Sequence, residues 1–228
     1  MRTGGFSKSP YSSLNLGLST KDDPNDVAHN RHQFFNAIGI NEKNIASSGQ
    51  VHGKAILIAE KAGRYQGYDA IVTNNKNLFV AVSIADCCPI LLYDKVHHAV
   101  AAIHAGWRGT VTGIVRETLC KMQSAFGTEG ADTLAYIGTC IAAKSFEVGA
   151  DVASQFDNRF ISVTNTSGKF LADIKTANLQ QLLDFGVPLD SIEISPYCTV
   201  LNNNEYFSYR KEGQESGRML AVIGVKKN

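Results

Sequence analysis

Residues 78–109 read Leu-Phe-Val-Ala-Val-Ser-Ile-Ala-Asp-Cys-Cys-Pro-Ile-Leu-Leu-Tyr-Asp-Lys-Val-His-His-Ala-Val-Ala-Ala-Ile-His-Ala-Gly-Trp-Arg-Gly. Short apolar runs bounded by polar residues predict three strands in this stretch, over 78–84, 89–93 and 99–104. No helix-length segment separates them. Strands that follow one another directly in sequence favour an α+β fold with mixed sheets over a doubly wound parallel sheet.

The same patterns, followed outward, predict the remaining elements. Further strands are expected over 55–59, 70–73, 134–137, 191–194 and 219–225. Helices are expected over 26–37, 111–126, 148–156 and 173–185, and a glycine follows three of them as a C-terminal stop. Residues 2–20, rich in Gly, Ser, Pro and Asn, are expected to be irregular. No repeat or change of composition divides the chain, so residues 1–228 are expected to form one domain.

The composition excludes several classes of protein. Apolar residues make up 44% of the 228 residues and charged residues 19%, a balance typical of globular proteins. The net charge of +1 gives no electrostatic reason to expect nucleic acid or an anionic membrane as a partner. No apolar run approaches the roughly 20 residues of a membrane-spanning helix. Five scattered cysteines do not make a disulfide framework, and we expect a cytoplasmic protein with reduced thiols.

Three side chains that suit a metal ion stand at the ends of apolar runs: His52, Cys87 and His104. Two imidazoles and one thiolate suit a borderline-soft ion such as zinc, and the same set also suits copper. A closed structural zinc site has four protein ligands, whereas three leave one position open for water or substrate. The trio therefore predicts a catalytic metal site, and hence an enzyme.

Each of these residues also has a simpler interpretation. A histidine after an apolar run is commonly a hydrogen-bonded core residue, and a cysteine there is commonly a small hydrophobic side chain. The shared position at element ends favours a common site, because neighbouring strands that end at one edge bring their side chains together. Asp86 is expected either to orient a histidine or to cap a turn. Cys88 is expected to point away from Cys87.

Taken together, these residues resemble the YfiH-like family, also called the laccase-domain or multicopper polyphenol oxidase family, whose members are described as purine nucleoside phosphorylases. The resemblance runs nearly end to end, and its motifs are very specific in combination. In chain order they are Arg2-Thr3-Gly4-Gly5, Ser12-Ser13-Leu14-Asn15-Leu16, Asn30-Arg31, Gln50-Val51-His52-Gly53, Ala85-Asp86-Cys87, His104-Ala105-Gly106-Trp107-Arg108-Gly109, Phe146-Glu147-Val148-Gly149, Cys198-Thr199, Phe207-Ser208-Tyr209-Arg210 and Ser216-Gly217-Arg218.

The resemblance implies a four-layer α/β/β/α fold of the YfiH type and a zinc site at His52, Cys87 and His104. It implies phosphorolysis of adenosine, inosine and S-methyl-5′-thioadenosine, with adenosine deamination as a second reaction. The partners would be a purine nucleoside and phosphate, and the chain a monomer or weak homodimer. Arg108 and Arg210 are our candidates for binding phosphate, because guanidinium groups bind it bidentately. One departure concerns Gly138-Thr139-Cys140, where many relatives have Ile-Gly-Pro; it adds a thiol of unassigned role.

Three other functions remain open. A copper polyphenol oxidase would use the two histidines and the cysteine, but six histidines cannot also furnish a second, histidine-rich cluster. A cysteine hydrolase would use Cys87 as nucleophile and His104 as base. Its substrate would be a peptidoglycan precursor, a UDP-MurNAc-amino acid amide, since some relatives are associated with editing such precursors. A non-catalytic module would bind a nucleoside or metal without turnover.

Overall fold

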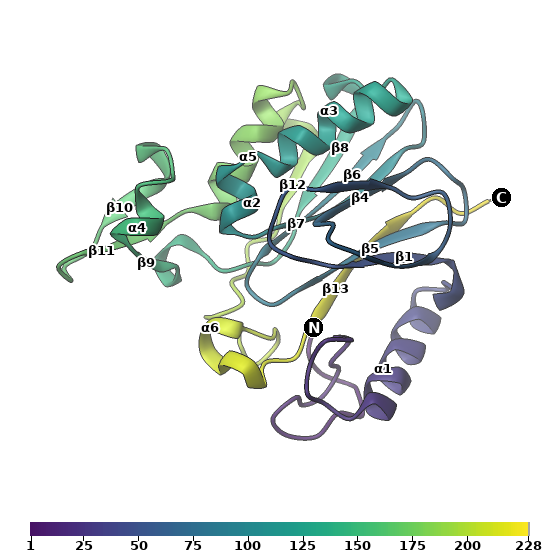
Figure 1. The fold of residues 1–228 in the computed structure, drawn as a ribbon, viewed down its shortest axis with the longest axis horizontal. Helices are drawn as coiled ribbons and strands as arrows, with labels where there is room; N and C mark the ends of the chain where they lie inside the picture. Colours follow the sequence, from purple (N-terminus) through teal and green to yellow (C-terminus); the bar gives the residue numbers. More distant parts are fainter. Residues whose placement is uncertain (228) are drawn as a thin grey trace.

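A computed structural model describes residues 1–227, in which thirteen strands form three sheets. The six-stranded sheet has the order β12 (Ile192–Ile194), β8 (Thr133–Ile137), β6 (Cys88–Asp94), β7 (Val100–Ala105), β4 (Ala70–Thr73) and β2 (Ile56–Ile58). The four-stranded sheet has the order β13 (Met219–Gly224), β5 (Phe79–Ile84), β1 (Ile45–Gly49) and β3 (Gly63–Gln66). A small sheet, β10 (Ile161–Val163), β11 (Lys169–Ala172) and β9 (Glu147–Gly149), projects from the body (Figure 1).

Both larger sheets mix parallel and antiparallel pairs, which confirms the α+β expectation. In the smaller of the two, β1 runs parallel to β3 and β5, while β13 runs antiparallel to β5. In the larger, β6 and β7 are antiparallel neighbours, as expected for strands joined by a short turn. The helices are α1 (Pro24–Ala37), α2 (Trp107–Val111), α3 (Ile114–Phe126), α4 (Ala150–Ala153), α5 (Ile174–Asp184) and α6 (Tyr209–Glu212). None of the helices in residues 1–227 has the length and apolar character needed to cross a bilayer.

Four layers follow from how these elements pack (Figure 1). α1 covers the outer face of the four-stranded sheet, where Phe35 packs against Phe79. The other face of that sheet meets the six-stranded sheet, and Val80 of β5 lies in one cluster with Ala102 of β7. α3 and α5 cover the far face of the six-stranded sheet, where Leu119 and other helix residues join the largest buried cluster. The order is therefore helix, sheet, sheet, helix, as the resemblance implied.

The two-residue period of the strands decides which side chains enter the space between the sheets. In β7, Val100 and Ala102 belong to the cluster between the sheets, whereas Ala101 and Ile103 belong to the cluster beneath α3. Because successive side chains alternate, the next residue on the inter-sheet side is His104. The strand thus places a polar ring at the end of an otherwise apolar row.

The structure corrects two predicted helices. The helix expected over 111–126 is two helices, since α2 begins earlier and Gly113 breaks the run with a left-handed backbone (φ 79°). The helix expected over 148–156 is wrong at both of its ends. Its first residues form β9, which pairs with β11, and only the four residues of α4 are helical. Pairing with a distant strand here overrides the local helical pattern.

Two of the strands that the sequence did not predict, β1 and β3, lack apolar alternation. β1 contains the polar run Ser47-Ser48-Gly49 and β3 is mostly exposed, yet β1 lies between two neighbours in its sheet. β10 and β11 are only three and four residues long, too short for their apolar residues to stand out as a strand pattern. Residues 2–20 are free of helix and strand in the described chain, as predicted.

Candidate metal centre and adjoining cavity

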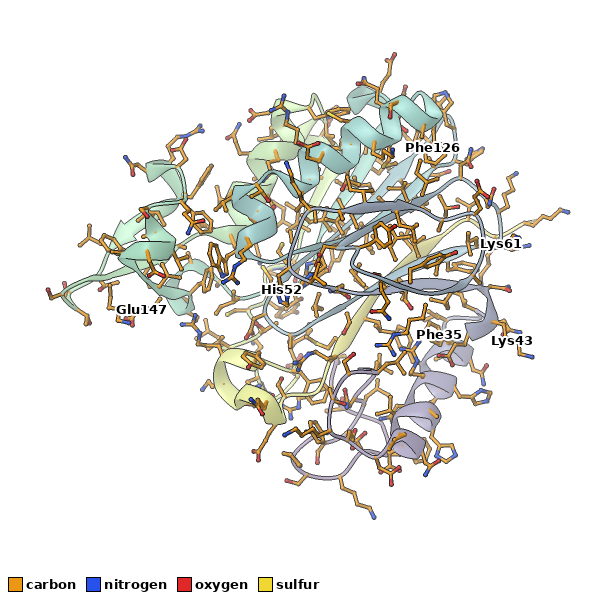
Figure 2. The ribbon with its side chains drawn as sticks, viewed as in Figure 1. Phe35, Lys43, His52, Lys61, Phe126 and Glu147 are labelled. Carbon is orange, nitrogen blue, oxygen red and sulfur yellow. The ribbon has the colours of Figure 1, made fainter. Side chains whose placement is uncertain are left out.

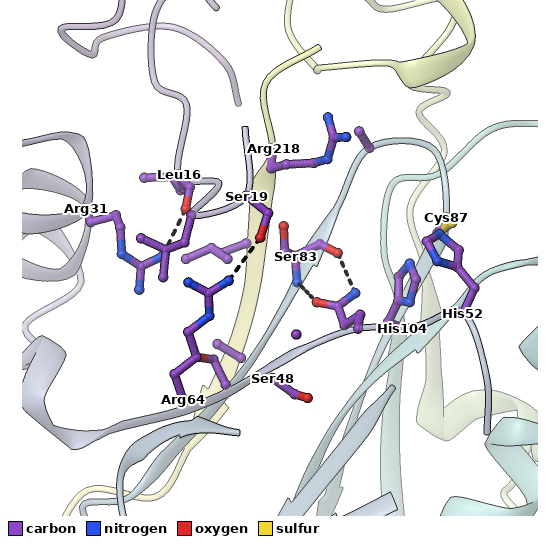
Figure 3. Close-up of a pocket in the computed structure, with 17 residues that line it drawn as sticks. Leu16, Ser19, Arg31, Ser48, His52, Arg64, Ser83, Cys87, His104 and Arg218 are labelled. Carbon is purple, nitrogen blue, oxygen red and sulfur yellow. Dashed lines mark hydrogen bonds between the residues drawn. The ribbon is translucent and has the colours of Figure 1, made fainter. Parts of the chain in front are cut away.

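The structure brings His52, Cys87 and His104 together. Within residues 1–227 they form the one group of at least three potential metal-binding side chains, and their donor atoms all lie within 4.8 Å of one another. The two imidazole rings meet edge to face, with centroids 4.8 Å apart. Figure 2 shows His52 at one end of the paired sheets, and Figure 3 shows the three side chains together. His52 lies on the loop after β1, Cys87 on the turn before β6 and His104 in β7.

Strand register explains why these three segments converge. β6 pairs with β7 so that Pro89 lies opposite His104, and residues directly opposite share one face of the sheet. Cys88 belongs to the cluster beneath α3, on the other face, as predicted. Cys87, one residue earlier, therefore turns toward the side of His104. The preceding Asp86 has a left-handed backbone (φ 85°), which makes the sharp turn between β5 and β6.

Asp69 is a site residue that the sequence did not reveal. It is fully buried immediately before β4, and its Oδ1 lies 2.9 Å from Nδ1 of His104. The same carboxylate accepts hydrogen bonds from the backbone N–H groups of His52 at 2.9 Å and Gly53 at 2.8 Å. The local signal is weak, since an acid at the entrance to a buried strand is usually a turn residue.

The electrostatics of the cluster favour a thiolate beside a protonated ring. Burial alone raises the pKa of Cys87, but the charge of His104 and hydrogen bonds from both histidines outweigh it and lower the pKa to about 6. Burial lowers the pKa of His104, but the Cys87 thiolate and Asp69 outweigh it and raise the pKa to about 9. Thiolate is the form of cysteine that binds metal ions and attacks electrophiles.

The Asp86 carboxylate contacts residues far along the chain and, in the described chain, bonds to neither histidine of the cluster. It accepts a hydrogen bond from the Thr199 hydroxyl and another, at 2.6 Å, from the backbone N–H of Arg210. These contacts tie the Cys87 turn to Thr199 and to the first turn of α6. In the described chain, the carboxylate that bonds to a histidine of the cluster is that of Asp69.

The donor set fits zinc. A tetrahedral ion with bonds of about 2.0–2.3 Å holds its donor atoms about 3.3–3.6 Å apart. The exposed His52 ring has room to close the remaining gap. Behind the donors stands Gly106, where an added Cβ would lie 3.1 Å from Cδ2 of His52 and 3.2 Å from Sγ of Cys87. The absence of a side chain at Gly106 keeps this space free.

A cavity of about 240 Å³ adjoins the cluster, and its walls carry three guanidinium groups (Figure 3). His52, Cys87 and His104 line one end. The rest is lined by apolar and hydroxyl side chains and by Arg31 from α1, Arg64 from β3 and Arg218 immediately before β13. No Asp or Glu lines the cavity within the described chain. The arrangement favours an anionic or strongly polar ligand.

The predicted phosphate-binding arginines lie elsewhere. Arg108 places its guanidinium 4.3 Å from the centroid of the Trp107 ring. Arg210 donates to the Glu147 carbonyl at 2.9 Å and lies near the Phe146 ring. Neither lines the cavity, and their phosphate role stays a prediction. Cys140 is fully buried in the cluster beneath α3 and makes an isolated β-bridge with Cys198.

Fold and donor set together define the class: a four-layer α/β/β/α protein with a candidate His–Cys–His metal centre at one end of its paired sheets. The chain belongs to the family described as multi-copper polyphenol oxidoreductase laccase, whose family model matches residues 1–226. The resemblance noted from the sequence motifs is therefore confirmed.

Two relatives carry the same activity in their names. A purine nucleoside phosphorylase of Bacteroides thetaiotaomicron is 38% identical over 242 positions, which cover 99% of this chain and 90% of that protein. Purine nucleoside phosphorylase YfiH of Escherichia coli is 36% identical, covering 97% of this chain and 90% of that protein.

Solved structures show the same fold. The crystal structure of YfiH from Bacillus licheniformis superposes with a TM-score of 0.94 at 29% identity, covering 99% of this chain and 90% of that one. YlmD from Geobacillus stearothermophilus gives the same TM-score and coverage at 30% identity.

Proposed function

We propose that this protein is a zinc-dependent purine nucleoside phosphorylase that acts on adenosine, inosine and S-methyl-5′-thioadenosine, and that it also deaminates adenosine. The observation that carries the proposal is the cavity with three metal-binding side chains at one end, three arginines on its walls and no acidic side chain among its described lining residues. The names of the relatives support the phosphorylase activity.

Phosphorolysis needs an anion held beside the ribose. A phosphate oxygen bonds to C1′ while the bond from C1′ to the purine nitrogen breaks, giving ribose 1-phosphate and the free base. Arg218 is our leading candidate for holding this phosphate, because it lines the cavity and, in the described chain, its guanidinium donates only to the carbonyls of Ser216 and Gly217. Arg31 is a weaker candidate, since Glu42 already pairs with it at 2.6 Å.

The other end of the cavity would serve the metal-assisted chemistry. His52, Cys87 and His104 would hold the ion, which supplies Lewis-acid chemistry beside the bound purine. Leu16, Leu18 and other apolar side chains give the cavity a surface on which a base can pack. In deamination the same end would orient the purine so that water replaces the amino group of adenosine, releasing ammonia and inosine.

The copper oxidase reading draws less support from the geometry. The other four histidines lie on α1 and in the turn between β6 and β7, away from the cluster; they are His29, His32, His97 and His98. Within the described chain they do not assemble the second metal cluster that a multicopper oxidase requires.

One experiment tests the proposal. The purified protein is analysed for bound metal and incubated with adenosine in the presence and absence of phosphate, and the products are separated by chromatography. We expect about one zinc per chain, adenine release only with phosphate, and some inosine in either case. Inosine without phosphate-dependent adenine would contradict the phosphorylase, and nucleoside binding without turnover would favour the binding module.

A second candidate function has a specific observation in its favour. Asp69, His104 and Cys87 form a chain of interacting side chains, which is the arrangement that a cysteine hydrolase uses. Such an enzyme would cleave a UDP-MurNAc-amino acid amide after complete removal of metal and would lose activity on thiol alkylation. The phosphorylase instead predicts that a chelator abolishes activity and that zinc restores it.

A further inference from the structure

One buried carboxylate contacts both histidine segments of the candidate metal centre. Asp69 bonds to the ring of His104 and to the backbone around His52, which lie 52 residues apart in the sequence. We infer that Asp69 is the positioning residue that aims both imidazoles at one point, and that without its charge the three donors do not converge on a metal ion. The inference rests on the metal site of the proposed function.

The first contact decides which nitrogen of His104 is available. Nδ1 of His104 lies 2.9 Å from Oδ1 of Asp69, and a carboxylate can only accept a hydrogen bond. The proton of the ring is therefore held on Nδ1, which leaves the Nε2 lone pair for a metal. The backbone carbonyl of Asp69 also accepts the N–H of His104 at 2.7 Å, so ring and backbone are fixed together.

The second set of contacts shapes the loop that carries His52. Three successive backbone N–H groups point at the Asp69 carboxylate: Val51 at 3.2 Å, His52 at 2.9 Å and Gly53 at 2.8 Å. His52 itself adopts a left-handed backbone (φ 60°), which residues with a side chain seldom do. The hydrogen bonds to the Asp69 carboxylate offset the free-energy cost of this backbone conformation, which directs the exposed His52 ring toward the cluster.

Replacing Asp69 by asparagine removes the negative charge while keeping the shape of the side chain, and so tests whether metal binding needs that charge. Every group that faces Asp69 is a donor, namely three backbone N–H groups and Nδ1–H of His104. An amide offers one oxygen and one NH₂ group, so Asp69→Asn must place donors against donors or let the His104 proton move to Nε2. The second outcome blocks the nitrogen that the metal needs. Either outcome weakens metal binding.

Asp94 offers a matched control at the other end of β6. It is also fully buried, and its carboxylate accepts the N–H groups of Val96 and His97 and lies 2.9 Å from Nδ1 of His97. Asp94→Asn therefore makes the same chemical change in a similar network remote from the cluster. It should lower stability without changing metal affinity.

The experiment measures zinc affinity by competition with a chromophoric chelator, together with the visible spectrum of the Co²⁺-substituted protein. We expect Asp69→Asn to bind zinc about 10- to 100-fold more weakly and to change the Co²⁺ spectrum, while Asp94→Asn matches the wild type in both. Equal affinity of Asp69→Asn and wild type overturns the inference, as does an equal loss in both variants. Absence of stoichiometric zinc in the wild type instead overturns the metal site itself.

A measurement on the wild type serves if Asp69→Asn fails to fold. Nitrogen-15 NMR of the zinc-loaded protein reports which ring nitrogen of His104 carries the proton. We expect Nδ1–H with Nε2 bound to the metal. A metal bound through Nδ1 of His104 would overturn the inference, because Asp69 would then have no proton to hold.

Discussion

Replacing Gly106 by alanine would crowd the donors without straining the backbone. Gly106 is extended (φ −69°, ψ 169°), a conformation that alanine adopts freely. The added Cβ would lie 3.1 Å from Cδ2 of His52 and 3.2 Å from Sγ of Cys87, both short of an ordinary contact. Without metal, the exposed His52 can turn aside. In the metal-bound protein, His52 and Cys87 must both approach the ion. The added methyl group therefore destabilises the metal-bound state more than the metal-free state.

The size of the effect follows from packing energetics. Forcing an extra methyl group into a packed site costs about 1–3 kcal/mol, which corresponds to an affinity loss of about 5- to 150-fold at 1.4 kcal/mol per tenfold change. The metal-free protein should lose little stability. Alanine reduces the conformational entropy of the unfolded chain, which stabilises the folded state by about 0.4–1 kcal/mol and offsets part of the crowding. Gly106→Ala therefore separates metal affinity from folding.

The assay combines chelator competition for zinc with urea unfolding of the metal-free protein. Gly53→Ala is the matched control, since its Cβ would meet its nearest neighbours, Asp69 and Val51, at 3.6 and 3.7 Å, ordinary contact distances. We expect weaker zinc binding in Gly106→Ala alone. Wild-type zinc affinity in Gly106→Ala would refute the reasoning, and so would an equal loss of affinity in Gly53→Ala.

Three other predictions concern single side chains. Cys87→Ala should lose stoichiometric zinc and both purine reactions while keeping its fold by circular dichroism, with Cys120→Ala, at an exposed thiol, as control; retained activity with bound zinc would exclude Cys87 as a ligand. Arg218→Gln should raise the KM for phosphate about 10- to 150-fold, the worth of a charged hydrogen bond. An unchanged KM, or a larger rise in Arg108→Gln or Arg210→Gln, would move the phosphate site to those residues. Burial raises the pKa of Asp94, but hydrogen bonds from His97 and Val96 contribute to holding it below its usual value of 3.8. A carboxyl group whose pKa is lower in the folded than in the unfolded protein stabilises the fold at pH values above its unfolded pKa. This stabilisation is lost as the pH falls through the folded pKa. The free energy of unfolding of the wild type, measured in urea, should therefore exceed that of Asp94→Asn by less below about pH 4. An advantage that stays constant to pH 2 would contradict this.

The sequence was sufficient for elements whose stability is local. The strands of residues 78–104 and the helices α1 and α5 were predicted within one or two residues at most ends, because apolar periodicity and glycine stops act over short distances. The sequence also singled out the three candidate donor residues, since Cys87 and His104 close apolar runs and His52 precedes a glycine and a predicted strand. These features depend on neighbours in the chain, and so they can be read along it.

The tertiary structure alone decided what depends on partners far apart in the chain. β1 ends in the polar run Ser47-Ser48-Gly49 and gives no strand pattern, yet two parallel neighbours fix it in the sheet. Asp69 looks like a turn residue until β4 pairs with β7 and sets it opposite His104. Arg218 belongs to one of the family motifs, but no local pattern assigns it a role, and only the packing of β13 brings it to the cavity wall. The sequence specifies which side chains are charged, but strand register and the packing of the layers determine which of them meet at one point.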